Sequence, residues 1–275
     1  MRFQDSVIFS DLDGTLFNHY GFVSPSDIEA IRKYTDQGGL FAVSTGRVPD
    51  NMMDALQSVV WNVPGIILNG AAIYDPQKRE YLHSVYADRE ALSDVLHYAL
   101  SKFPNLDIQV YSESGILYVS SKDTVNRAFW ELHKRSRFVS IEEAKKERWF
   151  KALLFGRKEN LNQVLLYLDE KKLTDHFTQV FAATDIVPGI EYLELLPRNV
   201  NKGTAISVCR KLPVFSGRKF LCIGDYNNDK EMLIAADIAV CPKNSHPDIL
   251  KICDVLVQTN NNNALAGLIS RIPSL

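Results

Sequence analysis

Residues 7–15 read VIFSDLDGT, and this stretch decides how the rest of the chain is interpreted. Four residues of a type that folds into protein interiors run directly into Asp11 and Asp13, which are separated only by Leu12. Burying carboxylates at the end of an apolar strand costs free energy unless something compensates them. Either the two aspartates lie in solvent at an ordinary strand end, or they hold a cation and carry out chemistry.

Five short apolar runs share the character of this first one. They are continuous rather than alternating in polarity, which is typical of strands buried on both faces of a parallel sheet. The runs are residues 7–10, 40–44, 65–68, 219–224 and 238–241. Helices are expected between them, near residues 25–37 (capped by Ser24), 49–59, 202–211 and 228–236. Alternating strands and helices predict an α/β fold with a doubly wound parallel sheet.

The middle of the chain has a different pattern, which predicts an inserted α+β domain with its own small sheet. We expect a hairpin that turns at Glu113-Ser114-Gly115. The other expected elements are helices at 88–102, 122–135 and 159–171 and strands at 150–156 and 177–183. The predicted division is therefore a core made of residues 1–83 and 188–275, interrupted by a cap made of residues 84–187.

Composition excludes several classes of protein. The formal net charge of −2 over 275 residues gives no reason to expect a nucleic acid or an anionic membrane as partner. No apolar run approaches the roughly 20 residues that span a bilayer, and the polar start MRFQDS does not resemble a signal peptide. Nothing in the sequence indicates the oligomeric state.

The cysteines and histidines argue against a disulfide framework or a zinc site. The four cysteines (Cys209, Cys222, Cys241 and Cys253) form no closely spaced pair, and the six histidines are scattered. We therefore expect reduced thiols and a cytoplasmic protein. A run of four asparagines, Asn260 to Asn263, is interpreted as a loop and a helix cap.

Unusual polar residues stand at the ends of several predicted elements. Besides the DLDGT stretch, residues 44–47 read STGR after the second strand, and residues 224–229 read GDYNND after the fourth. Residues 201–203, NKG, open the helix before that fourth strand. Open α/β sheets bind ligands at the carboxyl ends of their strands, so these segments are expected to converge.

The ordered set DxDGT, TGR, NKG and GDxxND, followed by Met232, resembles the haloacid dehalogenase (HAD) superfamily. Within it the chain is similar to the Cof-type phosphatases, whose cap is inserted between the second and third motifs. Asn69-Gly70-Ala71 and Tyr192-Leu193-Glu194 also fall where that family has similar residues. The resemblance therefore covers nearly the whole chain and implies a Rossmann-like core with an α+β cap.

The resemblance implies roles for the acidic residues. Asp11 corresponds to the nucleophile that attacks phosphorus and forms an aspartyl-phosphate. Asp13 corresponds to the general acid and base. Mg²⁺, which prefers oxygen ligands, would be held by the carboxylates of Asp11 and Asp225 and by the backbone carbonyl of Asp13, with Asp229 orienting the ligand shell.

The resemblance also implies a set of groups that bind the phosphoryl oxygens. These are the backbone N–H of Leu12, the Thr45 hydroxyl, the Gly46 N–H, the Lys202 ammonium and the Asn228 side chain. Alternatives stay open at this point. The alternative for Thr45 is a helix cap, and the alternative for Lys202 is a surface lysine in a first helical turn.

Arg47 and Lys151 each have two possible roles, and other positions near the site depart from the family pattern. Arg47 is balanced between a structural ion pair and a substrate contact, and Lys151 of the predicted cap is favoured as structural. Lys243 stands before Asn244 where the family often has glycine or aspartate, and Cys241-Pro242 makes the same loop stiffer than usual, which would alter substrate fit without changing phosphoryl transfer. Tyr226, at a position that is often small or acidic, is another change that would face the substrate.

These features predict a Mg²⁺-dependent phosphatase that hydrolyses small phosphorylated metabolites, with sugar phosphates as the expected class. A large cap suits small-molecule substrates. Within the same superfamily, a phosphomutase or a dedicated sugar-phosphate phosphatase is the alternative enzyme. The alternative outside catalysis is a sensor that binds phosphorylated metabolites, which degenerate catalytic carboxylates would favour; none is degenerate here.

Overall fold

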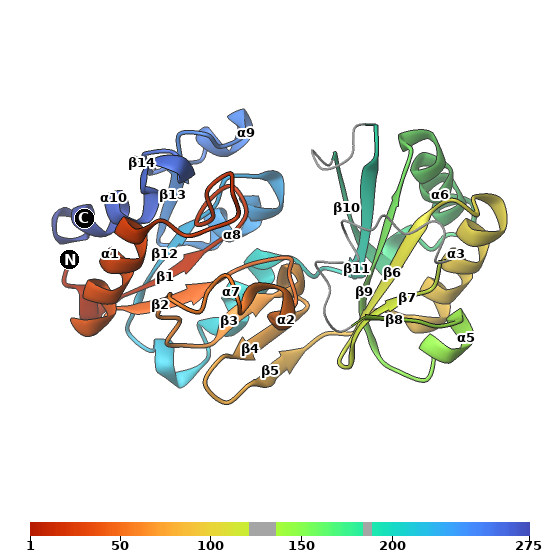
Figure 1. The fold of residues 1–275 in the computed structure, drawn as a ribbon, viewed down its shortest axis with the longest axis horizontal. Helices are drawn as coiled ribbons and strands as arrows, with labels where there is room; N and C mark the ends of the chain where they lie inside the picture. The colour runs from red at the N-terminus through yellow and green to blue at the C-terminus, as the bar shows by residue number, and fades with distance from the viewer. Residues whose placement is uncertain (121–135, 184–188) are drawn as a thin grey trace. The chain divides into compact units, whose positions relative to one another are not determined.

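The computed structural model describes residues 1–120, 136–183 and 189–275. The chain forms two compact units (Figure 1). The first unit combines Met1–His83 with Asn201–Leu275, and the second unit is Ser84–Val200. No helix among the described residues is long and apolar enough to cross a membrane.

The first unit is built on a five-stranded sheet with the order β14-β13-β12-β1-β2. Every neighbouring pair in this sheet runs parallel. The strands are β1 (Ser6–Ser10), β2 (Leu40–Val43), β12 (Lys219–Ile223), β13 (Ile238–Pro242) and β14 (Val255–Val257). Four of them were predicted, whereas β14 is only three residues long and half exposed, which leaves little apolar signal.

The order of the strands makes this sheet doubly wound. From β1 the chain moves through α1 to β2 on one side, and from β12 it moves through α8 to β13 on the other. Because such crossovers are right-handed, opposite directions place α1 and α8 on opposite faces of the sheet. The helices of this unit are α1 (Pro25–Asp36), α2 (Pro49–Met52), α7 (Lys202–Cys209), α8 (Lys230–Ala235), α9 (Pro247–Leu250) and α10 (Ala264–Arg271). The winding reverses between β1 and β12, so a ligand site is expected there.

Two predictions for the first unit were wrong in detail. The run at 65–68 is not one of the strands of the main sheet, and a single parallel bridge between Ser44 and Ile66 links it to the residues after β2. Instead, β3 (Gly65–Ile67) pairs antiparallel with β4 (Ala72–Asp75) in a three-stranded sheet completed by β5 (Glu80–Ser84). Left-handed backbone at Leu68 (φ 54°) and Asn69 (φ 53°) turns the chain back on itself there. The helix predicted at 49–59 has only the single α-helical turn of α2, with turns following it.

The second unit contains a six-stranded sheet with the order β10-β11-β9-β6-β7-β8, antiparallel except for the β7–β8 pair. Its strands are β6 (Asp107–Ser112), β7 (Gly115–Tyr118), β8 (Ser136–Phe138), β9 (Trp149–Gly156), β10 (Phe177–Ala183) and β11 (Glu191–Pro197), and its helices are α3 (Arg89–Lys102), α5 (Ile141–Ala144) and α6 (Lys158–Glu170). The predicted hairpin at 113–115 is confirmed. The helix predicted at 122–135 lies outside the described residues.

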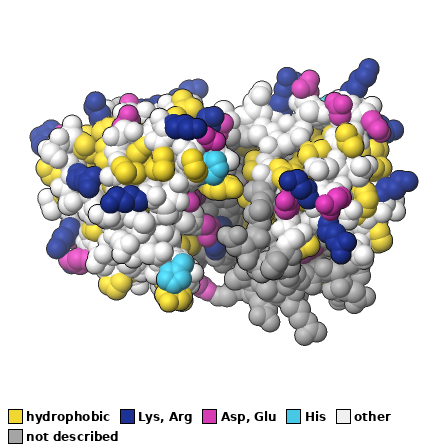
Figure 2. Space-filling view, turned by 90° about the horizontal axis from the view of Figure 1, so that it is seen from above, with side chains coloured by type: hydrophobic (Ala, Val, Ile, Leu, Met, Phe, Trp, Pro, Cys, Tyr) yellow, Lys and Arg dark blue, Asp and Glu magenta, His cyan; other side chains and the backbone are white. Residues whose placement is uncertain are grey.

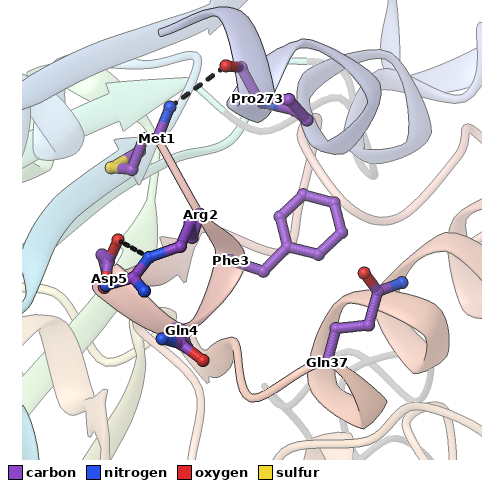
Figure 3. A pocket seen from close by; sticks show the side chains of 7 residues that line it. All are labelled: Met1, Arg2, Phe3, Gln4, Asp5, Gln37 and Pro273. Carbon is purple, nitrogen blue, oxygen red and sulfur yellow. Dashed lines mark hydrogen bonds and ion pairs between the residues drawn. The ribbon is translucent and has the colours of Figure 1, made fainter.

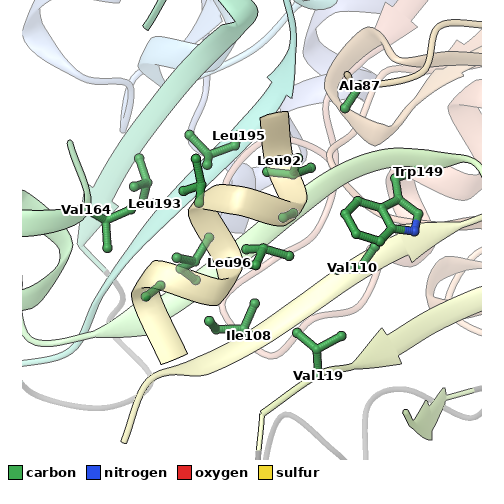
Figure 4. Close-up of a cluster of buried hydrophobic side chains, with 14 of the residues drawn as sticks. Ala87, Leu92, Leu96, Ile108, Val110, Val119, Trp149, Val164, Leu193 and Leu195 are labelled. Carbon is green, nitrogen blue, oxygen red and sulfur yellow. The ribbon is translucent and has the colours of Figure 1, made fainter. Parts of the chain in front are cut away.

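One face of this sheet packs against the helices through a single apolar cluster (Figure 4). Leu92 and Leu96 of α3 meet Ile108 and Val110 of β6 and the fully buried Trp149 of β9. A core of this size supports the second unit as a compact body with its own interior.

The return to the first unit comes later in the chain than the predicted boundary after residue 187. β11 is hydrogen-bonded to β10 on one side and to β9 on the other, so its residues are part of the second unit's sheet. The observed boundary is between Val200 and Asn201. The first boundary, at His83, coincides with the predicted one.

Seven short 3-10 helices complete the described elements. They are η1 (Phe3–Asp5), η2 (Leu68–Gly70), η3 (Thr174–His176), η4 (Pro213–Phe215), η5 (Asn227–Asp229), η6 (Asn260–Asn262) and η7 (Ile272–Ser274). The amino terminus donates to the carbonyl of Pro273 (3.1 Å), so both chain ends meet beside a shallow groove that also involves Phe3 and Gln37 (Figure 3). This groove lies before the start of β1, whereas Asp11 follows the end of that strand.

The surface carries charges of both signs. Figure 2 shows lysine and arginine side chains interspersed with aspartate and glutamate on the visible face of the described residues. The mixture of both signs agrees with a formal net charge of only −2.

Gly70 provides a test of how the first unit is packed. Its φ of +101° is left-handed, and a Cβ there would overlap the backbone carbonyl of Asn201 at the start of α7. We expect Gly70→Ala to lower the free energy of unfolding by about 2–4 kcal/mol, because strain and overpacking add. Urea denaturation followed by circular dichroism measures this change.

Gly267 in α10 is the matched control, because a Cβ at that position meets nothing within 4 Å. Gly267→Ala is expected to raise the free energy of unfolding by about 0.4–1 kcal/mol. If the two alanine variants unfold at the same urea concentration, the close approach of Gly70 to Asn201 does not constrain the fold.

Candidate active site

The carboxyl ends of β1 and β12 bring two aspartates together where the winding reverses. Ser10 and Ile223 are register partners, and Asp11 N–H donates to the Ile223 carbonyl (2.9 Å). Asp11 and Asp225 therefore leave their strands side by side. Asp11, Asp225 and Asp229 each offer a carboxylate oxygen within 4.8 Å of the others; we call these three residues the acidic cluster.

Lys202 enters this cluster from the start of α7. Its side chain is fully buried, and Nζ donates to Oδ1 of Asp11 (2.6 Å) and to Oδ1 of Asp229 (2.6 Å). A capping box between Asn201 and Thr204 fixes where the helix begins. Lys202 is therefore the first residue of α7, and its burial rules out the alternative of a surface lysine. The NKG motif starts this helix at the site.

Asp229 is fully engaged by protein donors. Oδ1 accepts from Lys202, and Oδ2 accepts from the backbone N–H groups of Asp225 (3.0 Å) and Tyr226 (3.2 Å). A Cβ on Gly224 would overlap the Asp229 side chain, which explains the glycine before Asp225. Asp229 therefore holds the GDYNND loop in place. Because both of its carboxylate oxygens accept hydrogen bonds from the protein, it is better suited to orienting this loop than to binding a cation directly.

Asp225 is held from the first motif. The hydroxyl of Thr15 donates to Asp225 Oδ1 (2.8 Å). Gly14 has φ of +80°, and a Cβ there would overlap the Asp225 carboxylate. The Gly-Thr of DLDGT thus serves to place Asp225; sequence reasoning gave Thr15 no role, although it stood inside the quoted motif.

Burial and mutual repulsion dominate the electrostatics. Burial, and then the charge of Asp229, raise the pKa of the Asp11 carboxyl well above its usual range, with Lys202 opposing them. Burial, and then Asp229, raise the pKa of Asp225 to about 7. Burial alone would lower the pKa of Lys202, but Asp11 and Asp229 outweigh it and raise that pKa.

The acidic cluster fits a divalent cation. Three carboxylates surround one ammonium group, so negative charge is left uncompensated. Within the described part of the chain, Oδ2 of Asp225 accepts no hydrogen bond and so remains open to a cation. Carboxylate oxygens of this kind are the ligands that Mg²⁺ prefers.

Residues predicted to bind phosphate lie on neighbouring loops. Thr45 and Lys202 are buried, and the side chain of Leu12 is fully buried between the two aspartates of the first motif. Thr45 Oγ1 accepts from Arg47 N–H (3.2 Å), whereas the N-cap of the next helix, α2, is Val48. The helix-cap alternative for Thr45 is therefore wrong.

Asn69 connects two of these loops. Asn228 Nδ2 donates to Asn69 Oδ1 (3.2 Å), and a Cβ on Gly46 would come within 2.9 Å of the Asn69 side chain. Sequence reasoning noted Asn69 only as part of the resemblance. Only the structure shows that this buried asparagine has left-handed backbone and holds a sharp turn.

Asp13 points its side chain differently from Asp11. Its carboxylate is 60% exposed and is not part of the acidic cluster. Arg47 binds it with two hydrogen bonds, from Nε (2.8 Å) and Nη2 (2.5 Å), and the guanidinium lies over the ring of Phe17. Arg47 thus forms an ion pair with Asp13 and contacts the first motif.

Lys151 has a structural environment in the second unit. Its ammonium forms a buried ion pair with Glu194 of the neighbouring strand and lies 4.6 Å from the centre of the Tyr111 ring. The exposed fractions are 3% for Lys151 and 2% for Glu194, which favours the structural interpretation.

Comparison with known proteins agrees with this architecture. The family model of haloacid dehalogenase-like hydrolases matches residues 8–269. The chain therefore belongs to the haloacid dehalogenase-like hydrolases, and it is an enzyme of the phosphatase type within them.

Three similar proteins are distant in sequence but match this chain over nearly their whole length. A 5-amino-6-(5-phospho-D-ribitylamino)uracil phosphatase of Bacillus subtilis is 24% identical over 96% of both chains. The crystal structure of TM0651 from Thermotoga maritima superposes with a TM-score of 0.80 at 23% identity, covering 97% of both chains. The sugar phosphatase BT4131 gives a TM-score of 0.78 at 19% identity, covering 98% of this chain and 100% of that chain.

The raised pKa of Asp225 leads to a prediction for the metal-free protein. A carboxyl whose pKa is raised by folding stabilises the fold below its unfolded pKa, and this contribution is lost as the pH rises through the folded value. For Asp225 this contribution to stability is lost between pH 3.8 and about pH 7. In the presence of a chelator, the melting temperature of Asp225→Asn is expected to be close to that of wild type near pH 3.8 and higher than that of wild type near pH 7.

Thermal melting of both proteins across this pH range measures the effect. Asn retains an oxygen that accepts from Thr15, so the loss of charge is the main change. Asp36→Asn, at an exposed position of α1, is the control and should show no growing difference. Parallel melting curves for wild type and Asp225→Asn would show that the cluster does not repel as described.

Proposed function

We propose that this phosphatase hydrolyses small phosphate monoesters through an aspartyl-phosphate on Asp11. The observation that carries the proposal is the buried Asp11 carboxylate, with Oδ1 fixed by Lys202 and Oδ2 directed to no protein donor among the described residues. The ion pair with Lys202 uses Oδ1 of Asp11, so Oδ2 remains available to attack phosphorus.

The reaction divides into two displacements. In the first, Asp11 Oδ2 attacks phosphorus while the ester oxygen leaves and takes a proton from Asp13. In the second, water attacks the aspartyl-phosphate, Asp13 accepts a proton from that water, and inorganic phosphate leaves Asp11 free again. Asp13 alternates between acid and base, and each role is worth about 10²–10⁴-fold in rate.

Positive charge and hydrogen-bond donors stabilise the transferring group. Lys202 compensates charge on Asp11 and on the phosphoryl oxygens, to which the Thr45 hydroxyl and the Leu12 and Gly46 N–H groups donate. Asn228 is assigned to the phosphate or the attacking water. Arg47 orients the Asp13 carboxylate through the two hydrogen bonds of the ion pair.

We assign Mg²⁺ as the cofactor. The carboxylates of Asp11 and Asp225 and the backbone carbonyl of Asp13 would hold it, with Asp229 orienting the loop that carries Asp225. When bound, Mg²⁺ offsets the repulsion between the anionic nucleophile and the anionic phosphate.

The names of similar proteins support a proposal for the substrate class. One relative is named for a phosphorylated ribityl compound and one structural neighbour for sugar phosphates. Both are polyhydroxylated monoesters, and we propose this class for the chain, with selection by the second unit acting as a cap. Four free cysteines suit a reducing, cytoplasmic location.

A panel of sugar and polyol phosphates assayed for release of inorganic phosphate, with Mg²⁺ and with a chelator, tests the proposal. Release that depends on Mg²⁺ is expected. A phosphomutase would instead move the phosphoryl group to another sugar, and a non-catalytic sensor would bind the ester without turnover.

Asp11→Asn isolates the nucleophile. A neutral amide is a poor nucleophile, so phosphate release is expected to fall by at least about 10³-fold, equivalent to about 4 kcal/mol in the activation barrier. The exposed Asp36→Asn serves as control and should retain wild-type rates. A loss of less than tenfold in Asp11→Asn would remove Asp11 from the nucleophile's role.

A further inference from the structure

The segment Gly14–His19 follows directly after Asp13, and we call it the post-motif loop. At its start, Thr15 binds Asp225 (2.8 Å). At its centre, Phe17 bridges to the backbone of Asp13 and lies under the guanidinium of Arg47, which binds the Asp13 carboxylate. The position of this loop therefore sets the position of Asp13.

Asn244 holds the beginning of the post-motif loop. Its Nδ2 donates to the Gly14 carbonyl (2.8 Å), and its Oδ1 accepts from the backbone N–H of Asn260 (2.9 Å). Both the nitrogen and the oxygen of the Asn244 amide are therefore hydrogen-bonded. Because one partner is an acceptor and the other a donor, the orientation of the amide is determined. Asn244 follows Lys243, the position at which the sequence departs from the glycine or aspartate that the family often has.

Asn260, which is hydrogen-bonded to Asn244, holds the centre of the same loop. Its side chain is buried, and Nδ2 donates to the Phe17 carbonyl (2.9 Å). Asn261 extends the contact, since its Oδ1 accepts from His19 N–H (2.9 Å). Two loops that are remote in sequence from Asp13 therefore bind three backbone groups of the segment that follows it.

The run of four asparagines divides by function. Asn262 donates to Thr259 Oγ1 (2.8 Å) within its own turn, and Asn263 has left-handed backbone (φ 61°) at the start of α10. These two fit the sequence interpretation of a loop and a helix start. Asn260 and Asn261 do not, because their side chains bond across to residues 17 and 19.

We infer that Asn244 and Asn260 are positioning residues that hold Asp13 in place for proton transfer. This inference rests on the proposed function, in which Asp13 is the acid and base. An asparagine suits the role because a short side chain presents a donor and an acceptor in one plane. Among the described residues, neither asparagine is hydrogen-bonded to the acidic cluster, so the effect passes through Gly14 and Phe17.

The test compares Asn244→Ala with Asn262→Ala, using 4-nitrophenyl phosphate and phenyl phosphate in Mg²⁺. Phenolate is the poorer leaving group and needs the proton from Asp13 more. In Asn244→Ala, kcat/KM for phenyl phosphate, which reports formation of the aspartyl-phosphate, is expected to fall about tenfold to 100-fold, as for a misplaced catalytic group, and kcat/KM for 4-nitrophenyl phosphate to fall less. Asn262→Ala should match wild type with both esters.

Two further measurements separate positioning from stability. Asn244 is exposed, so its variant should melt within a few degrees of wild type; the buried Asn260→Ala should repeat the leaving-group pattern. In an Asp13→Asn background, Asn244→Ala should add no further loss, because both changes act on one group.

Equal losses for the two esters, additive losses in the Asp13→Asn background, or an Asn244→Ala variant as active as Asn262→Ala would each overturn the positioning role while leaving the phosphatase intact. A wild-type protein that releases no phosphate from either ester or from the metabolite panel would overturn the proposed function and the positioning role together.

Discussion

The buried ammonium of Lys202, bound to Asp11 and Asp229 at 2.6 Å each, is the interaction on which the arrangement of the site depends. A buried ion pair stabilises little by itself, because desolvation consumes most of the Coulomb attraction. Its larger effect is on geometry. One cation that satisfies two carboxylates from different loops fixes the start of α7, the end of β1 and the GDYNND loop against one another.

Close packing around this group explains why small residues recur in the motifs. Gly14 makes room for the Asp225 carboxylate, Gly224 for Asp229 and Gly70 for the backbone of Asn201. Each glycine belongs to a different segment, and each lets a charged or backbone group approach where a Cβ would not fit. The same segments carry the chemistry, so packing and electrostatics constrain the same positions.

The uncompensated negative charge of the acidic cluster connects structure and proposed chemistry. Burial and repulsion raise the pKa values of Asp11 and Asp225, and a bound cation would relieve both effects. Asp13 lies outside the cluster, paired with Arg47 and held through the post-motif loop. A nucleophile inside the cluster and a proton carrier outside it fit the two roles that the displacement requires.

The sequence by itself determined the doubly wound core, the inserted second unit and the convergence of Asp11, Asp225, Asp229 and Lys202, because continuous apolar runs and polar strand ends are local patterns. It did not determine that residues 65–67 leave the main sheet, since left-handed backbone at Leu68 and Asn69 has no clear local signal. It also placed the second boundary too early, because β11 is assigned only by its two partner strands. Only the tertiary structure showed Thr15 bound to Asp225, Arg47 to Asp13, and Asn244 with Asn260 to the post-motif loop. Those contacts join residues up to 243 positions apart, and hydrogen bonds over such separations leave no periodicity in the chain that carries them.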